Sequence, residues 1–261
     1  MMKALNIAAT GMESQEMNVA TISNNIANIN TIGFKKGRTE FDDLLYETIQ
    51  APGSRSSSSS LNNIGIQIGS GSKVIAVRKN FGQGSPTITK NPFDLMISGE
   101  GFFGIIRPDN NISYTRNGSF SVNASGTLVN PKGFKVFPGL TFPPNTVSTA
   151  ISESGSVEAF IANQIEPIAV GQIPIFSFTN SPGLKSSGGN LYRATKSSGP
   201  PIQQVAGNEN AGSIMQGMLE SSNVSIMNEM TDLIKAQRAY EMNAKVMGIA
   251  DQMLQTVNNI R

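Results

Sequence analysis

Both ends of this chain carry apolar side chains at heptad spacing, and this pattern constrains the fold more than any other feature of the sequence. Near the N-terminus, positions that step by three and four residues are apolar, with Gln15 as the exception. These positions are Leu5, Ala8, Met12, Gln15, Val19, Ile22, Ile26 and Ile29. Such a stripe is typical of an α-helix that packs along another helix. The sequence therefore predicts an N-terminal helix over residues 1–30.

The C-terminal end repeats the pattern and adds a second apolar stripe. The first stripe keeps heptad spacing except at Asp251 and consists of Met230, Leu233, Gln237, Tyr240, Ala244, Met247 and Leu254. The second stripe lies on another face and consists of Val246, Ile249, Met253, Val257 and Ile260. Two stripes present more apolar surface than one partner helix can cover. We predict a C-terminal helix over residues 216–261 that pairs with the N-terminal helix as a coiled coil.

The opposite face of the N-terminal helix is unusual because it carries neutral polar side chains instead of charges. The residues of this face are Asn6, Thr10, Ser14, Asn18, Thr21, Asn24 and Asn25. Two interpretations stay open. The helix lies on the surface of its own domain, or it has protein on several sides.

The middle of the chain has a different pattern. Residues 31–75 contain a Ser-rich stretch from Gln50 to Asn63 that has no means of burying a core, so we predict an extended linker region there. Residues 76–215 alternate short apolar runs with turn signals such as Asn117-Gly118, which favours an antiparallel β-rich outer domain with a return linker. The predicted fold class is α+β, with terminal helices enclosing the linker and the β-rich domain.

The composition argues against catalysis. Cysteine and histidine are absent, so the sequence offers no thiolate, no imidazole base and no His or Cys metal ligand. Glu100 and Asp109 are the best candidates for paired carboxylates, but both stand at turn positions where acidic residues are common. We therefore expect no enzyme activity, no cofactor, no metal and no small-molecule substrate. A net charge of +2 without a basic stripe gives no support for nucleic-acid binding.

Three ordered segments carry a family resemblance. "SNNIANINTIGFKK" ends the N-terminal helix, Tyr114 to Val136 lies in the β-rich region, and Leu219 to Val246 enters the C-terminal helix. Together they resemble the rod and hook axial proteins of the bacterial flagellum. The residues that match the N-terminal signature of that family are Ala27, Asn28, Thr31, Gly33, Phe34 and Lys35. Asn and Gly suit the end of a helix, and the Phe is expected to anchor the departing chain.

Within the family, the total length and two further segments are most similar to distal rod subunits. These segments are Phe41 to Gly53 and Gly65 to Gly71. A proximal rod or hook-type axial subunit is the nearest alternative. A secreted β-rich adhesin with oligomerising helices is the alternative from another class, and it would form a closed oligomer instead of a filament.

The resemblance implies a structural subunit that polymerises into a helical tube and transmits torque from motor to hook. It implies an inner-tube interface of Leu5, Ala8, Met12, Val19, Ile22, Ile26, Ile29, Met230, Leu233, Tyr240, Met247, Leu254 and Val257. Uncharged side chains that could line an export channel are Gln252, Gln255, Asn258 and Asn259.

The resemblance also implies partners and a location. The partners would be further copies of the chain, proximal rod subunits, the hook protein, the surrounding P and L ring proteins and the flagellar export apparatus. The location would be the flagellar basal body, from the periplasm to the outer membrane. Lys3 is followed by no continuous apolar h-region, so we expect export without a cleaved signal peptide.

Overall fold

The computed structural model describes residues 2–51, 64–162, 166–208 and 211–259, with residues 258 and 259 described by their backbone alone. Most of the Ser-rich stretch, and Ile260 of the second C-terminal stripe, lie outside the described residues. The chain divides into two compact units. The helical unit comprises residues 1–27, 37–78 and 225–261, and the β unit comprises residues 28–36 and 79–224.

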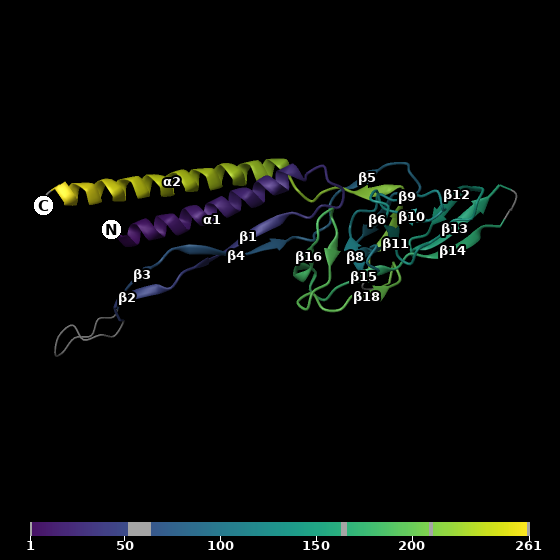
Figure 1. The fold of residues 1–261 in the computed structure, drawn as a ribbon, viewed down its shortest axis with the longest axis horizontal. Coiled ribbons are helices and arrows are strands. Elements are labelled where there is room, and N and C mark those ends of the chain that lie inside the picture. The colour runs from purple at the N-terminus through teal and green to yellow at the C-terminus, as the bar shows by residue number, and fades with distance from the viewer. Residues whose placement is uncertain (1, 52–63, 163–165, 209–210, 260–261) are drawn as a thin grey trace. The chain divides into compact units, whose positions relative to one another are not determined.

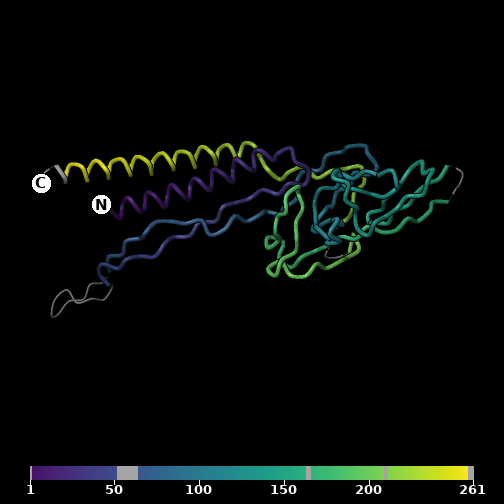
Figure 2. Tube along the Cα trace, in the orientation of Figure 1, coloured from purple at the N-terminus to yellow at the C-terminus, as the bar shows by residue number. Residues whose placement is uncertain are grey.

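The helical unit contains the two terminal helices, α1 (Met2–Ala27) and α2 (Ile226–Asn259). They pack side by side and run antiparallel, so that the N- and C-terminal ends of the chain lie at the same end of the pair (Figure 1, Figure 2). Helix α1 stops before residue 30, because the chain turns at Asn28, whose carbonyl accepts a hydrogen bond from the Thr31 amide at 3.1 Å. Helix α2 begins later than residue 216, because the preceding segment is used in strand pairing.

Two strand pairs complete the helical unit. They are β1 (Gly37–Asp43) with β4 (Ser72–Lys79), and β2 (Tyr46–Gln50) with β3 (Ile66–Gly69). Much of the described part of residues 31–75, which was predicted as an extended linker region, is thus paired into ribbons. Strand β1 packs beside α1.

The β unit is built from antiparallel strands. Its nine-stranded sheet has the order β16-β17-β8-β7-β11-β10-β9, and β15 joins β7 to β18. These strands are β7 (Phe102–Ile106), β8 (Ile112–Thr115), β9 (Ser121–Val122), β10 (Leu128–Val129), β11 (Lys135–Val136), β15 (Ile175–Ser177), β16 (Lys185–Ser186), β17 (Tyr192–Arg193) and β18 (Ile202–Gln204).

Smaller sheets complete the β unit. A three-stranded sheet holds β12 (Thr146–Ile151), β13 (Ser156–Ile161) and β14 (Ile168–Gln172). Two pairs join segments that are distant in sequence, β6 (Leu95–Ser98) with β19 (Ser213–Gln216) and β5 (Pro86–Ile88) with β20 (Met218–Glu220). A short 3-10 helix, η1, spans Ser181–Gly183.

The core of the β unit lies on both faces of β7, because consecutive side chains of a strand point to opposite faces. Phe103 and Ile105 belong to the larger cluster, while Phe102 belongs to an aromatic cluster with Tyr114 and Phe176. All of these side chains are buried. A Cβ at Gly104 would lie 2.6 Å from the Phe176 ring, so this position needs glycine.

The predicted α+β class, with a terminal helix at each end and a β-rich centre, is confirmed. Over the described ranges, neither α1 nor α2 has the length and apolar character of a membrane span.

Candidate functional site

The two terminal helices pack along a seam of small and apolar side chains. On α1 the seam buries Ala8 and Ile22, and on α2 it buries Ala236 and Ala250. The helices approach closely at Gly11, where an added Cβ would lie 2.7 Å from Nδ2 of Asn243. Small residues permit this approach, and the apolar side chains beside them lose contact with water.

Half of the α2 seam lies one residue earlier than the predicted stripe. The predicted residues Leu233, Met247 and Leu254 are partly buried. The intervening positions are taken by Glu229, Ala236, Asn243 and Ala250 instead of Met230, Gln237, Ala244 and Asp251. A heptad pattern allows both choices, and the larger apolar residue is the less suitable one where two helices approach closely.

The neutral polar face of α1 lies against the strands of the helical unit. The Ser14 hydroxyl donates to the Ser72 carbonyl at 3.2 Å, and the Thr39 hydroxyl donates to the Asn18 side-chain oxygen at 2.7 Å. Helix α1 therefore has α2 on one side and the β1–β4 ribbon on another. Asn6 and Asn24 of the same face are exposed, so the two interpretations of this face stay open.

Near the end of α1, a buried amide joins three segments of the helical unit. The Asn25 Nδ2 donates to the Gly37 carbonyl and to Oε2 of Glu229, both at 2.9 Å. The Gly37 amide donates back to Oδ1 of Asn25 at 2.9 Å. The sequence pattern placed Asn25 only on a polar face and did not predict its contact with Glu229. The available signal was one Asn among several neutral polar residues on a helix, which is too common to identify one buried residue.

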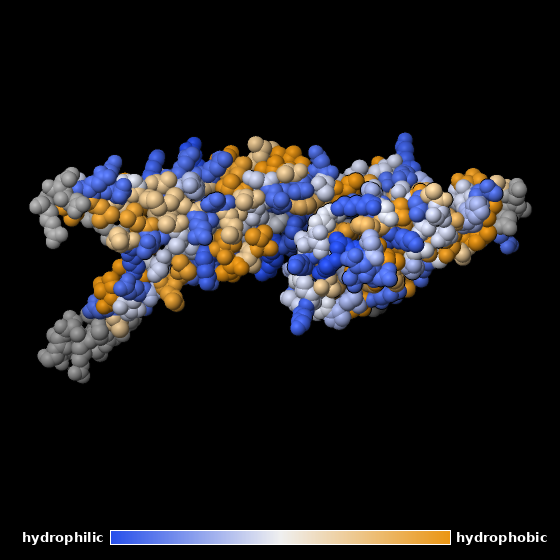
Figure 3. All heavy atoms as spheres, viewed as in Figure 1, coloured by the Kyte–Doolittle hydropathy of each residue, from blue (hydrophilic) through white to orange (hydrophobic). Residues whose placement is uncertain are grey.

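Helix α2 leaves a large apolar surface uncovered by the described residues. Its exposed apolar side chains are Ile226, Met227, Met230, Ile234, Tyr240, Met242, Val246, Ile249, Met253 and Val257. Figure 3 shows part of this surface as orange atoms over α2. We call these residues together the exposed α2 face, which extends around most of the helix outside the seam. Monomeric proteins rarely leave long apolar surfaces in water, so such a face indicates an interaction site.

The other predicted interface residues differ in their surroundings. On α1, Leu5, Met12, Val19 and Ile26 are partly buried. Ile29 lies beyond α1, in the β unit, and is also partly buried. Met230, Tyr240 and Val257 are exposed on α2. Of the predicted channel residues, Gln252 and Gln255 are exposed, while the side chains of Asn258 and Asn259 lie outside the described residues.

The segment after α1 carries the family signature and is held tightly in the β unit. Gly33 has a φ of 67°, and an added Cβ would lie 2.7 Å from the Asn117 backbone nitrogen, so only glycine fits. The Gly33 amide donates to the Glu220 carbonyl at 2.7 Å. Phe34 is buried and has the Lys79 ammonium 4.6 Å from its ring centroid. Phe34 therefore packs into the β unit directly after the turn at Gly33.

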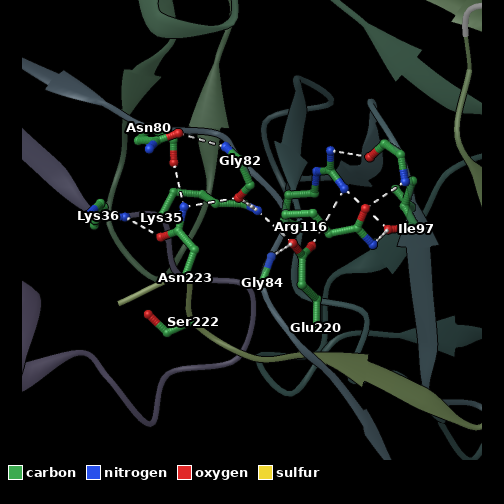
Figure 4. Close-up of polar contacts among 12 residues, drawn as sticks. Lys35, Lys36, Asn80, Gly82, Gly84, Ile97, Arg116, Glu220, Ser222 and Asn223 are labelled. Carbon is green, nitrogen blue, oxygen red and sulfur yellow. Dashed lines mark hydrogen bonds and ion pairs between the residues drawn. The ribbon is translucent and has the colours of Figure 1, made fainter. Parts of the chain in front are cut away.

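Lys35, Arg116 and Glu220 form a buried ion cluster, which we call the triad (Figure 4). Nζ of Lys35 lies 2.6 Å from Oε1 of Glu220, and Nη1 of Arg116 lies 3.5 Å from Oε2. Lys35 also donates to the Gly82 carbonyl at 2.8 Å, and the Gly84 amide donates to Glu220 at 2.8 Å. The triad thus joins segments that come from both ends and from the middle of the sequence.

Burial sets the electrostatics of the triad. It lowers the pKa of Lys35 and of Arg116, while the neighbouring Glu220 carboxylate opposes both shifts. Burial also raises the pKa of the nearby Tyr192 to about 12. Each shift follows from removing a charge from water, and the ionic partners offset part of that cost. With every member packed in the core, the triad is suited to joining chain segments.

The two carboxylates considered for catalysis lie in different environments. Glu100 lines a hollow of about 780 Å³, and Asp109 lies elsewhere on the surface, 3.9 Å from Nη2 of Arg193. Among the residues that the structure describes, no group of three or more His, Cys, Asp or Glu side chains is placed to hold a metal.

Three models of known protein families match segments at the two ends and in the centre of the chain. The family model for flagella basal body rod proteins matches residues 5–35. The model for the flagellar hook protein FlgE/F/G D1 domain matches residues 96–159. The model for the C-terminal part of flagellar basal body rod FlgEFG proteins matches residues 215–260.

Full-length relatives agree with these matches. The chain is 46% identical to the flagellar basal-body rod protein FlgG of Caulobacter vibrioides, with 100% of both chains covered. It is 44% identical to FlgG of Borreliella burgdorferi, with 100% of this chain and 99% of that protein covered. It is 34% identical to FlgG of Bacillus subtilis, again over 100% of both chains. The chain belongs to the family of flagellar basal-body rod proteins.

We expect Ile22→Asp to prevent the helices from pairing, because it places a carboxylate at a seam position that is 6% exposed. An unpaired charge in such a place costs several kcal/mol. Motility and recovery of the subunit in isolated basal bodies measure the effect. Ser23→Asp is the matched control because Ser23 is exposed on the same helix. Normal motility of the Ile22→Asp strain would contradict the seam.

We expect Lys35→Met to destabilise the β unit, because Glu220 then keeps only Arg116 as an ionic partner. Removing one member of a buried ion pair costs about 3–5 kcal/mol. Denaturant unfolding followed by tyrosine fluorescence measures the loss. Lys196→Met, at an exposed lysine, should change the midpoint little. A Lys35→Met protein as stable as that control would rule out a stabilising triad.

Proposed function

We propose that this chain is a structural subunit of the flagellar distal rod, which polymerises through its terminal helices into a tube that transmits torque from motor to hook. The exposed α2 face carries this proposal, because it lies on a helix that already has one partner and still presents apolar side chains along its length. Full-length identity to FlgG proteins supports the rod rather than the hook as the place of assembly. The proposed role needs no cofactor and no catalysis.

The energetics favour covering this face by other copies of the chain. Burying apolar surface contributes about 25 cal/mol per Å², so a face of this extent can drive association. A face on α2 that meets a different surface of the next copy makes a heterologous contact. Contacts of that kind build an open helical polymer when the rotation between copies does not close a ring. A coiled-coil arrangement of the helices would continue through the polymer in this way.

The second part of the proposal is that uncharged polar side chains near the end of α2 line a channel through the tube. Gln252 and Gln255 are exposed, and neither offers an ionic or apolar site to a passing chain. We place them, with Asn258 and Asn259, along the inside of the tube, where unfolded subunits would pass during export.

The remaining partners follow from the proposed location. The rod would meet proximal rod subunits at one end and the hook protein at the other, and the P and L ring proteins would surround it. The subunit would reach this place, between periplasm and outer membrane, through the flagellar export apparatus.

We expect Ile249→Glu to block polymerisation while the subunit still folds. Ile249 is 52% exposed in the subunit, so a carboxylate there stays hydrated until a second copy covers it. Motility and electron microscopy of basal bodies measure assembly, and circular dichroism of the purified subunit measures folding. Ile249→Leu keeps the apolar surface and should assemble normally. Complete rods from Ile249→Glu subunits would contradict the role of the exposed α2 face.

A further inference from the structure

The apolar residues of the seam between α1 and α2 repeat every seven positions, so they favour one alignment of the two helices only weakly over others. Large side chains recur every seven residues on α2, as Leu233, Tyr240, Met247 and Leu254. The small side chains recur in the same way, as Ala236, Asn243 and Ala250. Sliding α2 along α1 by one heptad, about 10 Å, would replace most seam residues by others of similar size. Apolar contacts alone therefore distinguish the native register poorly from its neighbours.

One buried polar contact breaks this repetition. Asn25 is 2% exposed and Glu229 is 5% exposed, and they are joined by the hydrogen bond from Nδ2 to Oε2 at 2.9 Å. The same Asn25 side chain exchanges two hydrogen bonds with the backbone of Gly37, where β1 begins. Both the oxygen and the nitrogen of the amide have partners. Asn25 thus binds α2 and the first residue of β1 together.

A second contact defines the same register. Gly11 faces Asn243, and both residues lie fourteen positions, or two heptads, from Asn25 and Glu229 respectively. In an antiparallel pair, both contacts belong to one alignment of the helices. The polar contact and the close approach at Gly11 are therefore satisfied together.

A slip by one heptad removes the polar contact. In one direction the slip brings Ala236 to Asn25, and an alanine side chain cannot accept a hydrogen bond. In the other direction it brings Glu229 to Asn18 and leaves Asn25 opposite residue 222, before the first residue of α2, so that Asn25 loses the carboxylate. A buried polar group that loses its partner is unfavourable, so both slipped registers are penalised.

We propose that Asn25 and Glu229 form a register lock, in which these two positioning residues fix α2 against α1 in a single alignment. Through Gly37 the lock also ties that alignment to the start of β1. A polar contact in a helix seam gives less stability than an apolar one but specifies register. The lock itself requires only the subunit, and its value for building a regular polymer rests on the proposed function.

Introduced cysteine pairs can test the lock directly, because the chain has no cysteine of its own. Gly11→Cys with Asn243→Cys reports the native register. Gly11→Cys with Ala250→Cys, or with Ala236→Cys, reports the two slips. Each pair is oxidised in the purified full chain, and intramolecular cross-links are quantified by mobility on a non-reducing gel. The cross-linking ratio does not depend on polymerisation. The register proposal can therefore be wrong while the proposed function is right, and the proposed function can be wrong while the register proposal is right.

With Asn25 and Glu229 intact, we expect the native pair to cross-link about tenfold more than either slipped pair. Asn25→Leu with Glu229→Leu should bring this ratio close to one. Ser14→Ala is the control, because it removes a buried polar contact that joins α1 to Ser72 and not to α2. It should leave the ratio unchanged.

An unchanged ratio in the double variant would overturn the proposal. If the double variant does not fold, Asn25→Ala takes its place, because it removes the amide without adding volume. A native ratio in Asn25→Ala would overturn the proposal equally. Thermal stability alone does not test the proposal, because any change in the seam alters the stability. The cross-linking ratio does test it, because replacing a residue that only stabilises the seam would leave the ratio unchanged.

Discussion

The antiparallel pairing of the two chain ends is the interaction on which the rest of the structure depends. Helix α1 covers one side of α2, and α1 in turn supports the β1–β4 ribbon through its neutral polar face. The β unit is likewise completed by segments from both ends, because Gly33 and Lys35 bind the strand that carries Glu220.

Buried polar groups mark the places where segments from distant parts of the sequence meet. In the helical unit Asn25 joins α1, α2 and β1, and in the β unit Lys35 and Arg116 converge on Glu220. Such groups are costly to bury, and apolar residues of the same size would often give equal or greater stability. Their advantage is that a hydrogen bond or ion pair requires one partner in one geometry. Packing supplies the affinity of these junctions, and the polar groups supply their specificity.

Much of the architecture could be predicted from the sequence because its pattern is regular. Stripes at heptad spacing predict the terminal helices, and turn signals between short apolar runs predict the antiparallel β-rich centre. The Asn and Gly residues of the family signature predicted the end of the N-terminal helix, and Gly33 just after α1 has a positive φ. The apolar surplus on α2 was also predictable, since two stripes on one helix exceed what a single partner can cover.

The remainder depends on contacts that periodicity does not reveal. A heptad pattern fixes the face of α2 only to within one residue, so the choice of Ala236 over Gln237 followed from how closely the helices approach. The pairing of Lys35 with Glu220 joins residues 185 positions apart, and no local pattern connects them. The ribbons within residues 31–75 were predicted only as extended chain, because short strands beside a helix carry few apolar side chains on their inner face.

The most direct measurement of the central claim is the reactivity of a cysteine on the exposed α2 face, in the free subunit and in the rod. Met253 is 49% exposed, and Met253→Cys would give the chain a single thiol there. A maleimide reagent should modify this thiol rapidly in dilute subunits and far more slowly in isolated basal bodies, because neighbouring copies cover the face after assembly. Met96→Cys, at a position that is 2% exposed, should react slowly in both and so report that the β unit is folded. Equal and rapid reaction of Met253→Cys in the subunit and in the rod would contradict assembly through the exposed α2 face.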